Sequence, residues 1–218
     1  MKRDFSTSVA GWLFIAGAVM FWLGWMLMPV HIGTFFQVGD FSAILQHRLL
    51  WIWLYRMHLF GFLVIVMALV ALGTLMTDTP ARILVWPGIT VAIAGLIVGA
   101  LAAAFYYHFG AWGAVKMAGA SAQAIHHYVD SLRNETEYVT CLVRFGRVFF
   151  GLGLVVFALG LARWKVLPLV ICVSAVGIGL ASMALTMAFA DQLELYAPIF
   201  YLKSAWFLAT GIVVIRGK

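Results

Sequence analysis

Six histidines mark the places in this chain where a ligand to a cofactor is most easily supplied. They are His31, His47, His58, His108, His126 and His127. Neutral imidazole binds transition metals and serves as an axial ligand of haem. His58 begins one long apolar run and His108 ends the next, so the two rings would lie at similar depth on antiparallel neighbours. We therefore expect His58 and His108 to hold any bound cofactor, with b-type haem as the leading candidate. A purely structural role for interfacial histidines is the alternative.

A second ligand set combines sulfur with imidazole. Met26, Met28 and His31 lie close together where the first apolar run ends. Thioether and imidazole ligands suit Cu(I), so these three residues form a candidate copper site. Methionine also fills gaps in packed helices, and we regard that role as the stronger interpretation. Copper therefore ranks below haem as a cofactor.

Charged side chains near one end of the apolar runs form a third group. Arg144 and Arg147 lie one helical turn apart, and Asp191 and Glu194 have the same spacing. Lys203 stands inside the last apolar run, where an unpaired charge is costly. We predict an ion pair between Lys203 and Asp191 or Glu194. Arg144 and Arg147 would balance negative charge on a bound group, such as haem propionates or a quinone head group.

The composition places all these residues in a membrane protein. Of 218 residues, 65% are hydrophobic and 10% are charged, and the mean hydropathy is +1.04. A soluble domain is typically about half apolar and a quarter charged. The net charge of +6 comes from basic residues scattered at the ends of apolar runs, which is typical of topology signals and excludes a nucleic-acid-binding stripe.

Six apolar runs are long enough to cross a bilayer, because a spanning helix needs about 20 apolar residues. We predict spans at 9–30, 57–77, 83–107, 139–161, 166–189 and 196–215. The expected fold is an all-α six-helix bundle, forming a single transmembrane domain over residues 1–218. Two longer connections, 31–56 and 108–138, contain helix-compatible segments at 41–55 and 121–133. We expect these segments to lie at the outer face, in the interface or as extensions of a span.

Basic residues orient the bundle, since Lys and Arg concentrate on the cytoplasmic side. The shorter loops and both termini carry most of these basic residues. We therefore predict a protein of the bacterial inner membrane with both termini in the cytoplasm. Aromatic residues near the outer boundary predict an interfacial belt; they are Trp51, Trp53, Tyr55, Tyr106, Tyr107, Trp112, Tyr128 and Tyr196. The motif Gly95-x-x-x-Gly99-x-x-x-Ala103 predicts a close helix contact.

Function is narrowed mainly by elimination. The chain has no G-x-S-x-G, no H-E-x-x-H, no phosphate-binding glycine loop and no metal-type cysteine pair. It gives no basis for assigning an enzymatic activity. We expect an integral membrane subunit or anchor of a larger redox or metal-linked complex at the outer face, in contact with lipid and with other membrane or periplasmic subunits. A small-solute or metal-ion transporter and a purely structural subunit are the alternatives.

Overall fold

The computed structural model of the protein describes residues 5–33, 35–189 and 193–217, and this part of the chain is helical without strands. Six helices are long and apolar enough to cross a membrane, which confirms the predicted all-α bundle. These helices are α1 (Phe5–Met26), α3 (Arg48–Thr74), α4 (Arg82–Lys116), α6 (Arg133–Arg163), α7 (Leu169–Ala188) and α8 (Ala197–Arg216). The shorter elements are α2 (Val38–Gln46), α5 (Ala122–Ser131) and the 3-10 turn η1 (Leu193–Tyr196).

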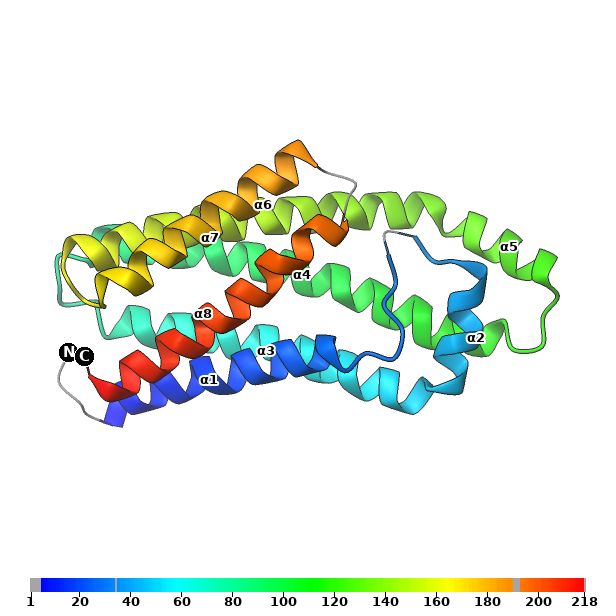
Figure 1. The fold of residues 1–218 in the computed structure, drawn as a ribbon, viewed down its shortest axis with the longest axis horizontal. Helices are drawn as coiled ribbons and strands as arrows, with labels where there is room; N and C mark the ends of the chain where they lie inside the picture. The colour runs from blue at the N-terminus through cyan, green and yellow to red at the C-terminus, as the bar shows by residue number, and fades with distance from the viewer. Residues whose placement is uncertain (1–4, 34, 190–192, 218) are drawn as a thin grey trace.

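The spanning helices follow one another around a closed ring. Each packs against the next in the sequence, from α1 through α3, α4, α6 and α7 to α8, and α8 returns to pack against α1. Helix α1 begins and α8 ends at the same end of the bundle, which we call the terminal end (Figure 1). Helices α2 and α5 lie at the opposite end, which we call the α2/α5 end. The ring therefore brings residues about 200 positions apart into one interior.

Three helices extend well beyond the others toward the α2/α5 end (Figure 1). Helices α3, α4 and α6 have 27, 35 and 31 residues. At 1.5 Å per residue they are about 40, 52 and 46 Å long, against about 30 Å of hydrocarbon. Helices α4 and α6 thus continue beyond the predicted spans 83–107 and 139–161, and the predicted connection 108–138 is mostly helix. The reason is physical: a hydropathy pattern reports contact with lipid, whereas backbone hydrogen bonding can continue a helix past the lipid.

The second predicted connection is also largely helical. Helix α2 begins at Val38, where Gln37 and Asp40 form a capping box, with the Gln37 backbone nitrogen donating to Asp40 Oδ2 over 2.7 Å. The chain turns at His47, and α3 begins one residue later. The aromatic-rich segment therefore divides into one short helix across the bundle end and one extension of a spanning helix.

A second apolar core lies beneath α2 and α5. Trp51, Tyr55 and Phe41 are almost fully buried there, and the tilted rings of Trp51 and Tyr55 lie 4.3 Å apart between centroids. The prediction of an interfacial belt was therefore wrong for Trp51, Tyr55 and Tyr196, which point into the protein. It fits Trp53 and Trp112, which are exposed. Sequence position gives the height of an aromatic residue along the bundle, but the direction of its ring depends on tertiary packing.

Glycines spaced seven residues apart hold α4 against α6. Gly88 and Gly95 on α4 face α6 at Phe157 and Phe150, and Gly153 on α6 faces α4 at Ala92. A Cβ at any of these positions would overlap backbone atoms of the facing helix. A seven-residue repeat keeps one face of a helix turned to its neighbour, and small residues let two backbones approach in lipid. The predicted small-residue contact thus involves Gly95, whereas Gly99 faces the Phe62 ring of α3.

The predicted orientation leads to a direct test. The turn between α3 and α4 and the turn between α6 and α7 lie at the terminal end, whereas Ala120 precedes α5 (Figure 1). We expect reporter fusions at Asp78 and Lys165 to report the cytoplasm and a fusion at Ala120 to report the opposite side. Phosphatase and fluorescent-protein fusions measure this. A cytoplasmic signal at Ala120 would reverse the orientation and leave the fold unchanged.

Candidate functional site

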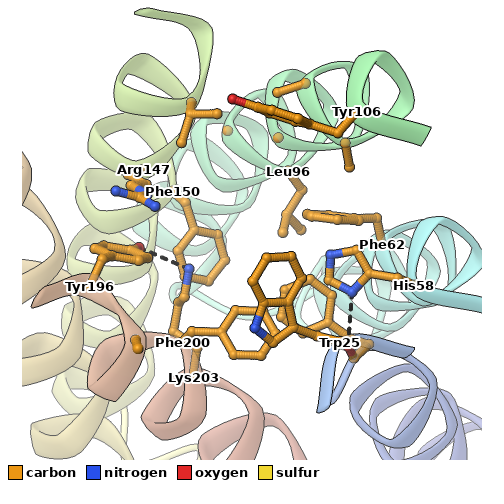
Figure 2. Close-up of a pocket in the computed structure, with 18 of the residues that line it drawn as sticks. Trp25, His58, Phe62, Leu96, Tyr106, Arg147, Phe150, Tyr196, Phe200 and Lys203 are labelled. Atoms are coloured by element: carbon orange, nitrogen blue, oxygen red, sulfur yellow. Dashed lines mark hydrogen bonds between the residues drawn. The ribbon is translucent and has the colours of Figure 1, made fainter. Parts of the chain in front are cut away.

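The ring of helices encloses a cavity of about 230 Å³ toward the α2/α5 end. It lies where α1 ends and α8 begins, and it is bounded also by α3, α4, α6 and the loop after α1 (Figure 2). Most of its wall is aromatic or aliphatic, and its ionisable nitrogen-bearing side chains, His58, Arg147 and Lys203, form two sides. The inner parts of the same helices, toward the terminal end, form a continuous core that includes Phe14, Ile65, Leu72 and Phe157. The cavity therefore occupies one end of the bundle only.

His58 forms the first polar side. Its ring is buried, stacks on Phe21 at 4.6 Å between centroids, and meets the edge of Phe62. Nδ1 lies 2.9 Å from the backbone oxygen of Phe21. A carbonyl oxygen only accepts hydrogen bonds, so Nδ1 carries the proton and Nε2 of the neutral ring is left as an acceptor. Nε2 faces the cavity in Figure 2, ready to accept a hydrogen bond or to ligate a metal.

Lys203 and Arg147 form the opposite side, on either side of the Tyr196 ring. The Lys203 ammonium donates to the Tyr196 hydroxyl over 2.9 Å and lies 4.8 Å from the centre of the Tyr196 ring. The Arg147 guanidinium carbon lies 3.7 Å from the same ring centre. Cation–π contacts of this kind are worth about 2 kcal/mol when desolvated. The tyrosine therefore holds two cations beside each other at the cavity wall.

Ser182 on α7 fixes the direction of the hydrogen bonds around Tyr196. The Ser182 hydroxyl donates to the backbone oxygen of Arg147 over 3.1 Å and lies 2.7 Å from the Tyr196 hydroxyl. With its own proton committed, Ser182 accepts from Tyr196, and the Tyr196 oxygen in turn accepts from Lys203. The chain Lys203–Tyr196–Ser182 thus runs from the cavity into the packed contact between α6 and α7, and it orients the tyrosine on which both cations depend.

Aromatic rings form the cavity wall between the two polar sides. Phe200 stacks against Phe21 at 4.7 Å, and Trp25 lies 5.7 Å from Phe200 and 5.8 Å from His58. Such a wall favours a flat ring that can stack, and it excludes bulk water. The cavity is thus built for a ligand with an unsaturated or aromatic ring and polar groups at two opposite edges.

The charges on the cavity wall favour electron-rich ligands. Among the described lining residues there is no Asp or Glu to offset Lys203 and Arg147. In a low-dielectric interior two cations repel a bare metal ion and attract anionic or carbonyl oxygen. The described part of the chain also contains no cluster of three or more His, Cys, Asp or Glu arranged to bind a metal.

Haem does not fit the cavity in its present form. His58 offers one axial nitrogen, and the two cations suit propionates, but the described lining contains no second histidine. The cavity volume is about 230 Å³. Pockets for drug-sized ligands hold about 300–1,000 Å³. A single small ring system fits better than a porphyrin.

The structure separates the residues predicted to bind a cofactor. His58 and Arg147 line the cavity, and Lys203 joins them there. His108 is exposed and stacks on Trp112 at 5.6 Å between centroids, away from the described cavity lining. Arg144 is partly buried on α6 and is not among those lining residues. The expected neighbourhood of His58 and Arg147 is thus present, whereas the expected pairing of His58 with His108 is not.

The sulfur–imidazole set does not converge in this structure. Met28 is buried in the second core, whereas Met26 is half exposed and His31 is exposed at the start of the loop. The His31 ring lies 5.2 Å from Trp25, and partial burial lowers its pKa below the usual value. A lowered pKa keeps the imidazole neutral at pH 7, but the two methionines face different surroundings. The copper site stays a prediction without geometric support.

Two members of the predicted ion pair cannot be placed. Asp191 lies outside the described residues, and the same holds for the side chain of Glu194. Within the described part of the chain, the partners of Lys203 are the Tyr196 hydroxyl and the rings of Tyr196 and Phe150. The carboxylate partner therefore remains a prediction beside an observed phenol partner.

Sequence reasoning missed Tyr196 and the ring-stacking residues Phe21, Trp25 and Phe200. Each was taken as an apolar span residue or a belt residue. One signal was available, because Tyr196 and Lys203 are seven residues apart and thus two turns apart on one helical face. No sequence signal shows that Phe21 and Phe200 face each other, because they lie on the first and last spanning helices.

The chain matches no protein-family model, no curated protein and no solved structure. Function must therefore be argued from the geometry of the cavity.

Proposed function

We propose that the protein is the membrane subunit of a redox complex and that it binds the ring of a quinone or quinol in the cavity. The observation that carries this proposal is the pairing of opposite polarities across an aromatic slot. His58 Nε2 accepts on one side, whereas Lys203 and Arg147 present positive charge on the other. A quinol hydroxyl can donate to Nε2 while the oxygen at the far edge of its ring accepts from Lys203.

The chemistry of the slot suits a ring that changes its protonation. A quinone has two carbonyl oxygens, and its reduced form has two hydroxyls, so each oxygen needs a partner that tolerates both states. A neutral imidazole accepts a hydrogen bond from the hydroxyl of the reduced ring. The nearby cations stabilise negative charge that develops on a ring oxygen. His58 would thus accept a hydrogen bond from a quinol hydroxyl at Nε2, with its ring held in place by the hydrogen bond from Nδ1 to the backbone oxygen of Phe21.

The electrons released by quinol oxidation need an acceptor, and we infer that a partner subunit provides it. A quinol gives up two electrons, and the described residues include no group of three or more His, Cys, Asp or Glu that could hold a metal ion to receive them. A partner subunit carrying a redox centre would supply this function. We expect it at the α2/α5 end, where the cavity lies and where α3, α4 and α6 project beyond the other helices.

The same geometry argues for binding in preference to transport. A transporter needs a substrate path that reaches both faces of the membrane, and its broken helices lie near the midplane. Here the residues toward the terminal end pack in a continuous core, and α1, α3, α4 and α6 run through it as unbroken helices. The cavity is a receptor site at one end of the bundle.

The binding experiment compares two histidines. We expect the protein in quinone-free nanodiscs to bind decylubiquinol saturably, as followed by quenching of tryptophan fluorescence, because Trp25 lines the cavity. His58→Ala should weaken binding about tenfold, since a lost buried hydrogen bond costs about 1–3 kcal/mol. His108→Ala is the matched control and should bind as the wild type does, because His108 is exposed on the surface.

Two outcomes would overturn the proposal. Equal weakening of decylubiquinol binding in His58→Ala and His108→Ala would contradict the quinone site. The absence of saturable binding in the wild type would do the same. An optical spectrum of the purified protein distinguishes the cofactor predicted from sequence. A Soret band that disappears in both His58→Ala and His108→Ala would establish a haem pair in place of the quinone.

A further inference from the structure

A cluster of arginines and aromatic rings covers the outside of α3 and α4 at the α2/α5 end. Arg56 Nε donates to the Tyr107 hydroxyl over 3.0 Å, and its guanidinium carbon lies 5.1 Å from the Trp53 ring centre. Arg48, two turns before Arg56 on α3, has its guanidinium carbon 5.9 Å from the Trp112 ring centre. These contacts use one nitrogen and one face of each guanidinium. The other N–H groups of Arg56 have no hydrogen-bond partner among the described residues and can bind a ligand.

The charge of the cluster is not balanced by nearby carboxylates. Within the part of the chain that the structure describes, neither Arg48 nor Arg56 has an ion-pair partner. Arginine presents five donors in a planar fork that matches a phosphate group. Tyr107 anchors Arg56 in one direction, so the fork is held in place before a ligand arrives. A phosphate at this position would gain charge-assisted hydrogen bonds with little ordering of the side chain.

Three exposed apolar side chains follow Arg56 toward the middle of the bundle, and we call them the apolar lane. Phe60 and Leu63 on α3 and Leu101 on α4 are all more than half exposed. Phe60 lies about 6 Å below Arg56 along the helix, at 1.5 Å per residue. Trp53 and Trp112 flank the cations above the lane, as aromatic residues do at the level of lipid head groups. The surface thus changes from acyl-chain chemistry to phosphate chemistry within one turn.

We propose that this surface is a binding site for one anionic phospholipid, with its phosphate on Arg56 and an acyl chain along Phe60, Leu63 and Leu101. The cationic cluster selects a negatively charged head group over a zwitterionic one. The apolar lane selects a lipid over a free phosphate ion. The site lies on the outside of the bundle, so it is independent of the quinone proposed for the cavity.

The test measures which lipid stays with the purified protein. We expect native mass spectrometry to show that the wild type retains phosphatidylglycerol about fivefold better than phosphatidylcholine, which is the effect of one cation near an anionic lipid. Arg56→Gln should abolish this preference. Tyr107→Phe should reduce it partly, because the charge remains but its anchor is lost. Arg133→Gln is the control, since Arg133 is exposed and pairs with Glu137.

Two further measurements complete the test. Competition with inorganic phosphate distinguishes a lipid site from a phosphate site, and Arg56→Lys distinguishes loss of charge from misfolding. Inorganic phosphate in excess should leave phosphatidylglycerol bound, and displacement by phosphate would show that the lane contributes nothing. Arg56→Lys should keep most of the preference and thereby show that Arg56→Gln acts through charge and not through misfolding. Equal retention of both lipids by the wild type, or an unchanged preference in Arg56→Gln, would overturn the proposal.

Discussion

Replacing Gly153 with alanine is expected to lower the free energy of unfolding by about 1–3 kcal/mol, the usual cost of overpacking a well-packed interior. The added Cβ would fall on the backbone nitrogen of Ala92 and within 2.6 Å of the backbone oxygen of Gly88. Backbone atoms cannot rotate away as the end of a long side chain can. Helices α4 and α6 must therefore move apart, and the seven-residue glycine contact is lost along its length.

Gly177 provides a matched control within the same protein. It also lies in the middle of a spanning helix, but nothing lies within 4 Å of the position that a Cβ would occupy. We expect Gly177→Ala to leave stability within about 0.5 kcal/mol of the wild type. Unfolding in mixed detergent micelles measures both variants. A similar loss in Gly177→Ala would contradict the α4–α6 contact as the cause, because no clash occurs at Gly177 and alanine has the higher helix propensity.

The same contact supports the cavity. Gly95 and Gly146 are among the cavity-lining residues, and Gly95 meets the α6 backbone at Phe150. A change at Gly153 that separates the two helices would therefore also move Arg147, which lies one residue beyond Gly146. Weaker ligand binding should accompany the loss of stability in Gly153→Ala and be absent in Gly177→Ala.

The spanning helices were predictable because their signal is local. A run of about 20 apolar residues identifies a span without knowledge of its neighbours. The ends of α4 and α6 were not predictable in the same way. The hydropathy of the first half of α6 is lowered by charged residues, yet the helix continues through them. They include Arg133, Glu135, Arg144 and Arg147. Most side chains between Arg133 and Tyr138 are exposed, and a hydropathy pattern does not report such a polar extension of a spanning helix.

The candidate site was predictable only in part. His58, Arg147 and Lys203 were identified because they are ionisable residues in or beside apolar runs. Such residues are costly in a membrane and usually have a partner or a function. Their grouping depends on the contact between α8 and α1, which closes the ring. No local pattern encodes that contact. The pairing of His58 with His108 followed from equal depth alone, and the rotation of α4 turns His108 to the outside.

Removing the charge of Lys203 tests what holds it inside the bundle. The described contacts are a hydrogen bond to the Tyr196 hydroxyl and cation–π contacts with Tyr196 and Phe150. A hydrogen bond to a charged group contributes about 1.5–3 kcal/mol. We therefore expect Lys203→Met to lower the free energy of unfolding by about that amount. A buried ion pair broken at one side costs more, about 3–5 kcal/mol, because the other charge is stranded.

The partner is identified by a double-mutant cycle. Tyr196→Phe removes the hydroxyl and keeps the ring, so the effects of Tyr196→Phe and Lys203→Met should be less than additive if the two side chains act together. Asp191→Asn and Glu194→Gln provide the comparison for the carboxylate predicted from sequence. A loss of about 3–5 kcal/mol in Lys203→Met that either of these changes restores would make the carboxylate the main partner. Strict additivity with Tyr196→Phe would contradict the phenol contact. Coupling to Tyr196 would show that the residue holding both cations at the cavity wall also keeps the Lys203 charge stable within the membrane.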